Sequence, residues 1–507
     1  MAPPVSQQTP AVRAVQCSKS NAAFHTTFSR LIPVPAHSVG TFFFRSFGCF
    51  ILQSALIPTR ADSIHYAWSM SKEQSDVKAI ERLADGTVKQ TNMLTGTEVW
   101  TVPGRGHRPL TVPATTQAPI DLERHGEYCA FCEHRYLETP PEKARVVKHE
   151  DGTWQKLENL RAEDLCETVA EFRRVPNLFE IVSYKYWHLN HGHVPSEAQH
   201  RRMADYLASP AGYDHVMRVV KARLMASGQT ADEVASLDDS QLLPEASGFF
   251  SGGHDLIVAR RHYTPGATMD TQLASSGTLT PEEHYQYMKL TTEAMEDLYQ
   301  LNEHVAYVAC FQNWLKPAGA SFDHLHKQLV AIDEHSVQTE AELGRLRRDP
   351  DIYKKILHTA ITRGLLLAQN EHAIALAGIG HRYPSIAIWP LGKAHNPWEA
   401  SPQKLRGVSD LVHAMHAATG AEVPCNEEWY HRPVDVPSPM RWRLLLKWRI
   451  STLAGFEGGT RIYLNTIDPW GVRDRVLPKL VELREAGKIA PMQIGDECKV
   501  DVSALDA

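Results

Sequence analysis

Acidic residues are absent from the first 61 residues of this 507-residue chain. That stretch is instead rich in Ser, Thr and Pro, and its basic residues are Arg13, Lys19, Arg30, Arg45 and Arg60. This composition resembles an organellar transit segment. The competing interpretation is an over-extended gene start, with Met70 as the true beginning. We therefore expect residues 1–75 to be a disordered or mis-assigned extension and leave them out of the fold prediction.

Long apolar runs, a basic excess and dense cysteines are also missing. The nearest candidate for a membrane span, Phe47–Ile57, is shorter than the roughly 18 residues that a spanning helix needs. A net charge of −6 argues against a broad nucleic-acid-binding surface. Eight cysteines include one close pair, Cys129 and Cys132, which indicates a reducing compartment rather than a disulfide scaffold. We expect a cytoplasmic protein with neither a membrane nor a nucleic-acid partner.

A strand–helix–strand–strand unit is predicted between Asp255 and Ile332. Residues 255–263 form an apolar strand that ends at His262. Thr280, Pro281 and Glu283 have the N-cap, N1 and N3 spacing of a capping box, and apolar residues follow at helical steps. Two further strands, at 305–315 and 322–332, are joined by a turn rich in small residues.

The same order of elements recurs in the second half of the chain. A strand is predicted at 385–395, a helix beginning at Ser401 and Pro402, and two more strands near 425–433 and 440–451. We interpret this as an internal duplication in an α+β fold, with helices packed on antiparallel sheet. The predicted parts are an N-terminal domain at 76–335, a helical connector at 336–372, and a degenerate C-terminal domain at 373–498. In that second repeat, Leu445 and Lys447 replace His324 and His326.

The CxxC pair Cys129 and Cys132 has the spacing of two zinc ligands. A closed tetrahedral site needs two more ligands, and His262 and His324 come from neighbouring predicted strands. His254 is a rival for His262. From spacing alone, a redox pair and two unrelated thiols remain alternatives to zinc.

The second conspicuous pattern is His324-x-His326-x-Gln328 in one predicted strand. Two residues that are two positions apart on a strand lie about 6.6 Å apart and point the same way. An imidazole is a competent nucleophile at neutral pH and can form a phospho-histidine type of intermediate. The preceding turn offers backbone N–H groups to a phosphate, and the hydroxyl of Ser321 adds a donor. With 26 histidines in the chain, an isolated HxH would be weak evidence.

The full string resembles the active-site pattern of the galactose-1-phosphate uridylyltransferase family, within the histidine-triad (HIT-like) superfamily. That pattern is an asparagine, a glycine-containing turn, a serine and His-x-His-x-Gln, and the matching residues here are Asn313, Gly319, Ser321, His324, His326 and Gln328. The family's proline between the two histidines is Leu325 in this chain. The resemblance implies two HIT-like repeats, of which the second has lost its site.

Four other segments follow the family order, namely those that contain the Arg105–Arg108 pair, the Cys129–Cys132 pair, Asn177 and His262. Arg105 and Arg108 match a pair of arginines that binds nucleotide phosphate, and Asn177 matches an asparagine at the nucleotide. Glu457 matches a sugar-contacting residue, although the residues after it depart from the pattern and leave the sugar in doubt. By the same resemblance, zinc is held by Cys129, Cys132, His262 and His324.

The resemblance implies a nucleotidyltransferase of the UDP-glucose–hexose-1-phosphate uridylyltransferase type. His326 would be the nucleophile, Gln328 and Ser321 would stabilise charge, and nucleotide sugars and sugar phosphates would be the small-molecule partners of a homodimer. One alternative is a phosphorylase or hydrolase acting on nucleoside-diphosphate sugars or dinucleoside polyphosphates. Another is a nucleotide-binding protein without turnover, against which the intact nucleophile string argues.

Overall fold

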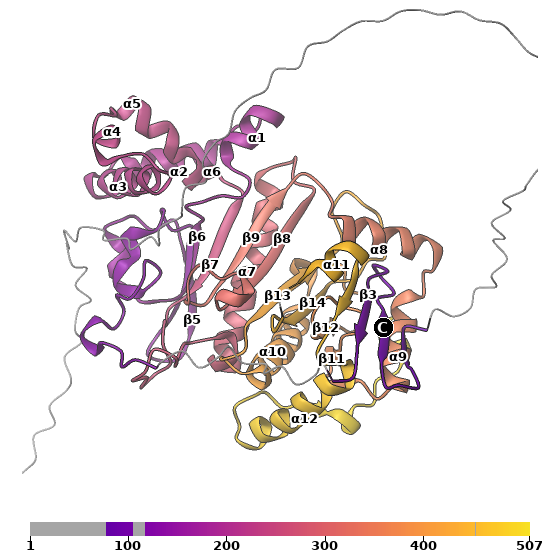
Figure 1. The fold of residues 1–507 in the computed structure, drawn as a ribbon. Helices are drawn as coiled ribbons and strands as arrows, with labels where there is room; N and C mark the ends of the chain where they lie inside the picture. The colour runs from indigo at the N-terminus through magenta and orange to yellow at the C-terminus, as the bar shows by residue number, and fades with distance from the viewer. Residues whose placement is uncertain (1–77, 105–116, 452, 507) are drawn as a thin grey trace, which may run out of the picture. The chain divides into compact units, whose positions relative to one another are not determined.

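The computed structural model describes residues 78–104, 117–451 and 453–506. The expected extension at 1–75 lies outside these residues, as do Arg105 and Arg108. In the described residues a twelve-stranded sheet runs through the protein, and every neighbouring pair in it is antiparallel (Figure 1). The α+β class predicted from the sequence is confirmed.

Two sheets contain all the described strands. The large sheet has the order β16 (Gln493–Ile494), β10 (Leu366–Gln369), β11 (Ala373–Ala377), β12 (Ser385–Pro390), β14 (Arg443–Trp448), β13 (Cys425–Tyr430), β8 (Tyr307–Trp314), β9 (His326–Ile332), β7 (His254–Ala259), β6 (Ala170–Pro176), β4 (Ala144–Lys148) and β5 (Trp154–Glu158). The small sheet has the order β1 (Ile80–Arg82), β2 (Val88–Thr91), β3 (Glu98–Thr101) and β15 (Ile462–Leu464).

The helices fall into a group between β6 and β7 and a group that follows β7 in the chain. The first group is α1 (Tyr184–His191), α2 (Glu197–Leu207), α3 (Pro210–Ala226), α4 (Ala231–Ala235), α5 (Asp239–Leu242) and α6 (Ser247–Ser251). The others are α7 (Pro281–Leu301), α8 (Val337–Arg348), α9 (Ile352–Thr362), α10 (Pro402–Thr419), α11 (Gly455–Thr460) and α12 (Pro469–Glu485). Helices α7 and α10 pack against each other and against central strands, and α12 packs on β10, β11 and β12.

The two faces of β9 have different surroundings. The Lys327 ammonium lies 4.8 Å from the ring centre of Tyr287 in α7, so this residue points toward the helices. Because side chains alternate along a strand, His326 and Gln328 point to the opposite face of the sheet. The helices therefore cover one face, and the predicted chemistry lies on the other.

The order of strands is mirrored about the pair β8 and β13. On one side follow β9, β7, β6 and β4, and on the other β14, β12, β11 and β10. Asn313 and Asn426 are paired across this seam, and Asn426 is paired in turn with Lys447 of β14. Lys447 of β14 thus lies in the same row across the seam as Asn313 of β8.

Several predicted elements are confirmed and two need correction. Helix α7 begins with the predicted capping box, in which Thr280 and Glu283 each accept a hydrogen bond from the other's backbone N–H. Strand β7 ends at Ala259, however, and β9 begins only at His326. His262 and His324 were therefore wrongly placed within strands: both lie in the adjoining loops, whose backbones are free to turn their side chains toward a shared centre.

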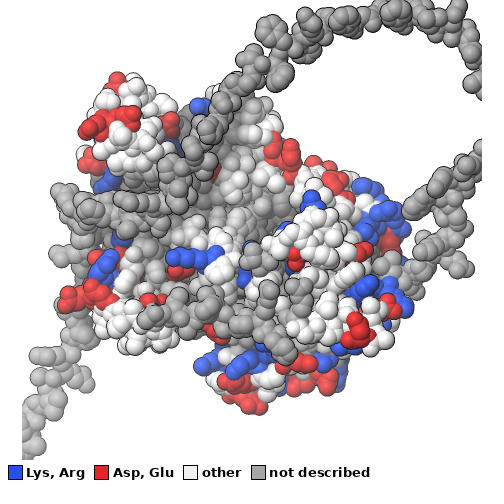
Figure 2. All heavy atoms as spheres, in the orientation of Figure 1, with Lys and Arg blue, Asp and Glu red and all other residues white. Residues whose placement is uncertain are grey.

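The range predicted as a helical connector contains α8 and α9, and also strand β10. No helix of the described ranges is long and apolar enough to cross a membrane. Figure 2 shows Lys and Arg interspersed with Asp and Glu over the described part of one face, with acidic side chains gathered over α4 and α5. The visible described surface thus has no single broad basic patch.

Candidate functional site

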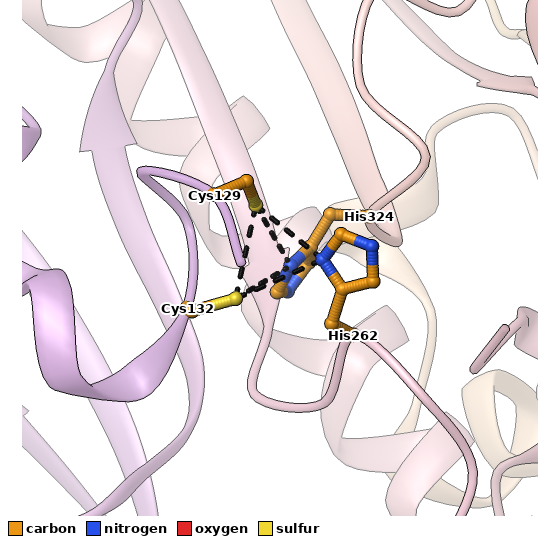
Figure 3. Close-up of side chains that lie close together, drawn as sticks. All are labelled: Cys129, Cys132, His262 and His324. Atoms are coloured by element: carbon orange, nitrogen blue, oxygen red, sulfur yellow. Dashed lines mark hydrogen bonds between the residues drawn. The ribbon is translucent and has the colours of Figure 1, made fainter. Parts of the chain in front are cut away.

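Two cysteines and two histidines from three separate loops converge on one point (Figure 3). Cys129 Sγ lies 3.8 Å from Cys132 Sγ, 3.5 Å from His262 Nδ1 and 3.4 Å from His324 Nδ1. Cys132 Sγ lies 3.7 and 3.8 Å from the same two nitrogens. Tetrahedral zinc with ordinary bond lengths separates two sulfurs by about 3.8 Å and a sulfur from a nitrogen by about 3.6 Å. The residues present fit a zinc ion.

The protonation of this group also suits a metal. His324 donates its Nε2 hydrogen to the carbonyl of Ala259 at 2.6 Å, which leaves the Nδ1 lone pair facing the cysteines. Between the two thiols, the hydrogen bond that they share lowers the pKa of Cys132 and raises the pKa of Cys129. Zinc binds thiolates, so metal binding would displace the thiol protons.

One ring nitrogen of His326 makes a hydrogen bond, and the other has no partner among the described residues. Its Nδ1 donates to the carbonyl of His324 at 2.7 Å, so the lone pair of the neutral ring is on Nε2. The side chain is 4% exposed, and burial lowers the pKa of His326 to about 4. The imidazole is thus neutral at physiological pH, which is the form that can act as a nucleophile. The ring of Phe131, in the cysteine loop, lies 5.3 Å away.

Gln328, on the same face of β9, is held by a buried histidine. The backbone N–H of Ile181 donates to His254 Nδ1 at 3.2 Å. His254 Nε2 lies 3.2 Å from Gln328 Oε1. Burial lowers the pKa of His254 to about 4, so the ring stays neutral. The Asn177 amide also contacts this ring, 2.9 Å from Nε2.

The turn before β9 contains a glycine in a left-handed conformation. Gly319 has φ = +89°, a left-handed conformation that residues with a Cβ rarely adopt. A Cβ placed there would meet only Asn313 Nδ2, at 3.9 Å, so conformation rather than space requires glycine. Ser321 is exposed in the same connection. The structure thus brings Asn313 beside the turn that precedes His326.

Known proteins resemble this chain over the region that contains both the candidate zinc-ligand residues and His326. A family described as "Domain of unknown function (DUF4921)" matches residues 83–506. The chain belongs to the DUF4921 family. The match covers both halves of the mirrored sheet and the four residues that fit a zinc ion.

This DUF4921 chain is also similar to curated enzymes. It is 25% identical over 185 residues to an ADP-glucose phosphorylase of Arabidopsis thaliana, covering 34% of this chain and 52% of the relative. It is 25% identical over 204 residues to a galactose-1-phosphate uridylyltransferase of Thermotoga maritima, covering 36% and 63%. The chain thus matches between about half and just under two thirds of these relatives. The predicted resemblance to the uridylyltransferase family is confirmed.

A solved structure supports the fold over a larger share. The crystal structure of an ADP-glucose phosphorylase from Arabidopsis thaliana with bound ADP-glucose has a TM-score of 0.50 and 17% identity. The likeness covers 77% of this chain and 97% of that one. At this identity it establishes a shared architecture.

Not every predicted residue joins the group around His326. Arg105 and Arg108 lie outside the described residues. Glu457 lies in α11, where its carboxylate accepts from the backbone N–H of Ala454 at 3.0 Å. Sequence reasoning considered His254 only as a metal ligand and missed its contact with Gln328. The signal would have been the pairing of β7 with β9, which places Leu256 opposite Gln328 and His254 one step along the same face.

Proposed function

We propose that this DUF4921 protein transfers a nucleoside monophosphate from a nucleoside-diphosphate sugar to a phosphate acceptor through a covalent intermediate on His326. In the first step, His326 Nε2 forms a bond to the α-phosphorus, the bond from phosphorus to the bridging oxygen breaks, and a sugar 1-phosphate leaves. In the second step, an oxygen of the acceptor phosphate attacks the same phosphorus and the P–N bond breaks.

One observation carries this proposal: the neutral imidazole of His326 directs Nε2, which has no partner among the described residues, to the face of the sheet opposite α7 and on the same side as Gln328. The hydrogen bond from His326 Nδ1 to a carbonyl fixes the ring and stabilises the positive charge that develops when Nε2 attacks. The amide N–H groups of Gln328 and the exposed hydroxyl of Ser321 are donors for the phosphoryl oxygens, whereas the backbone N–H groups of Ala318, Gly319 and Ala320 bond carbonyls within the turn. Because the leaving group is a weakly basic phosphate, the reaction needs no strong general acid, and positioning supplies most of the catalysis.

Zinc belongs to the same proposal as a structural ion. Cys129, Cys132, His262 and His324 would hold it, and it would stabilise the loops that flank β7 and β9. Since His324 supplies both a metal ligand and the carbonyl that orients His326, loss of the ion would disturb the nucleophile. The mirrored strand order supports two HIT-like repeats, the domain boundaries near 335 and 373, and a second repeat without a nucleophile.

The proposed activity has two versions, which differ in the phosphate that accepts the nucleoside monophosphate from His326. A sugar 1-phosphate acceptor makes the protein a hexose-1-phosphate uridylyltransferase-like enzyme, while inorganic phosphate makes it a phosphorylase. The similarity to an ADP-glucose phosphorylase supports the second version on the same footing as the first. A cytoplasmic location and a homodimer remain predictions from the sequence.

Transfer of radioactivity tests the proposal. We expect α-labelled ADP-glucose or UDP-glucose to leave acid-labile label on the wild-type protein and none on the His326→Gly variant. Unlabelled inorganic phosphate or a sugar 1-phosphate is then added, and the one that discharges the label identifies the acceptor. Nucleotide binding without label on the wild-type protein would contradict transfer and favour a binding protein.

A further inference from the structure

The seam between the two halves carries a pair of asparagines on the face that bears His326. Asn313 of β8 and Asn426 of β13 are partners in the sheet register. The Asn426 amide nitrogen donates to Asn313 Oδ1 at 2.7 Å and to the carbonyl of Ala318 at 2.8 Å. Both hydrogens of this amide are therefore used, one in the bond to Asn313 and one in the bond to the turn that contains Gly319.

A cation from the second half fixes which way the Asn426 amide points. Arg449 Nη1 donates to Asn426 Oδ1 at 2.7 Å. A guanidinium can only donate, so the oxygen of Asn426 must face Arg449 and the nitrogen must face Asn313. Arg449 is half-buried and stacks on Tyr383, with its central carbon 4.7 Å from the ring centre.

The orientation of the Asn426 amide also fixes the orientation of the Asn313 amide. Its oxygen accepts from Asn426, so its own amide nitrogen must point away from the seam. That nitrogen is the atom nearest to a Cβ built on Gly319, which places it at the turn before the nucleophile. It has no hydrogen-bond acceptor within the part of the chain that the structure describes. The chain of amides thus begins at a positive charge and ends in two free N–H donors.

We infer that Asn426 and Arg449, from the half without a nucleophile, are positioning residues that hold the Asn313 amide as a donor to an anionic phosphate oxygen of the bound nucleotide sugar. The inference rests on the proposed function and adds a role for the second half. Hydrogen bonds in series polarise one another, so the charge of Arg449 strengthens donation by Asn313 without touching the substrate. A phosphate that gains charge in the transfer step benefits more than the ground state does.

We call the chain of hydrogen bonds from Arg449 through Asn426 to Asn313 the relay. The Asn426→Asp variant tests it because the new side chain can no longer donate a hydrogen bond to Asn313. The carboxylate still accepts from Arg449 but cannot donate to Asn313. The Asn313 amide is then expected to turn its nitrogen toward the carboxylate and its oxygen toward the phosphate. We expect the labelling rate of His326 to fall about 100-fold or more, the size of the effect of losing one donor to a developing anion, with a smaller change in the KM for the nucleotide sugar.

A double-mutant cycle separates positioning from general damage. In the Asn313→Ala background, Asn426→Asp should lower the labelling rate by less than about threefold, because the group that it misorients is already gone. The matched control is Asn370→Asp, which makes the same change at a part-buried asparagine that bonds Gly407 in the second half, and which should label like the wild type. Bound zinc and the unfolding midpoint are measured for each variant.

The outcomes are distinct. Equal losses in both backgrounds, or a wild-type rate for Asn426→Asp, would overturn the relay while leaving the proposed function in place. A wild-type protein that takes no label with zinc bound would overturn the proposed function, and the relay with it. A large loss confined to the background that retains Asn313 is the result that the relay requires.

Discussion

Removing the charge of Glu427 should strongly destabilise the protein, because this carboxylate is fully buried and pairs with a buried lysine. Glu427 of β13 and Lys327 of β9 are both fully buried, and Lys327 Nζ donates to Glu427 Oε1 at 2.6 Å. His416 of α10 donates to the other carboxylate oxygen at 2.7 Å. Burial raises the pKa of Glu427, but the charge of Lys327 and the hydrogen bond from His416 outweigh it and hold the pKa well below the usual range.

The Glu427→Gln variant keeps the shape of the side chain and leaves Lys327 as an uncompensated buried cation. Breaking a buried pair by removing one partner costs about 3–5 kcal/mol, so we expect a loss of that size in the free energy of unfolding. Adding Lys327→Met removes the stranded charge and should restore most of the loss. The measurement is guanidinium unfolding at neutral pH with zinc present. Lys479→Met, at an exposed ion pair, is the control and should change nothing measurable.

This prediction also tests how the two halves are joined. The pair connects a strand of the first half with a strand of the second, and Lys327 stands between His326 and Gln328 in the sequence. We therefore expect Glu427→Gln to slow labelling of His326 as well as to destabilise the fold. A loss below about 1 kcal/mol, or a double variant as unstable as the single one, would refute the assignment of a mutually compensating buried pair.

Three further outcomes are expected. Cys132→Ser should abolish bound zinc in metal analysis while Cys498→Ser retains it; equal zinc in both would contradict the ligand set. His254→Phe should slow labelling of His326 about tenfold by freeing the Gln328 amide, and an unchanged rate would remove that contact from the account. Burial lowers the pKa of His215 to about 4 from about 6.5 in the unfolded chain, so its contribution to stability is complete above pH 6.5 and is lost as the pH falls toward 4. Denaturant titrations at about pH 7 and pH 5 should therefore show about 2 kcal/mol more loss in the wild type than in His215→Gln, and parallel losses would contradict this.

Local patterns predicted the elements that local interactions determine. The capping box at Thr280 marked the start of α7, apolar runs marked β8 and β14, and the recurring order of elements marked β13. Pairing between strands that are distant in the chain could not be predicted from local sequence patterns. Strand β15 joins β3 in parallel although some 360 residues separate them, with Ile462 opposite Glu98, and no spacing in either segment announces this.

The candidate site shows the same division. The CxxC pair and the His-x-His-x-Gln string could be found because their members are close in sequence. His262 was correctly grouped with the cysteines, but its loop position depends on where β7 ends, which periodicity does not fix. The partners of Gln328 and Asn313 are contributed by neighbouring strands, so His254 and Asn426 become visible only when the sheet register is known.

The central claim is that His326 carries a nucleoside monophosphate during turnover. Mass spectrometry of the zinc-bound protein, quenched after mixing with ADP-glucose or UDP-glucose, tests it most directly. We predict a mass increase of one nucleoside monophosphate on the peptide that contains His326, localised to that residue and absent from His326→Ala. An unmodified wild-type protein with every nucleoside-diphosphate sugar tried, or a modification on another residue, would contradict the account.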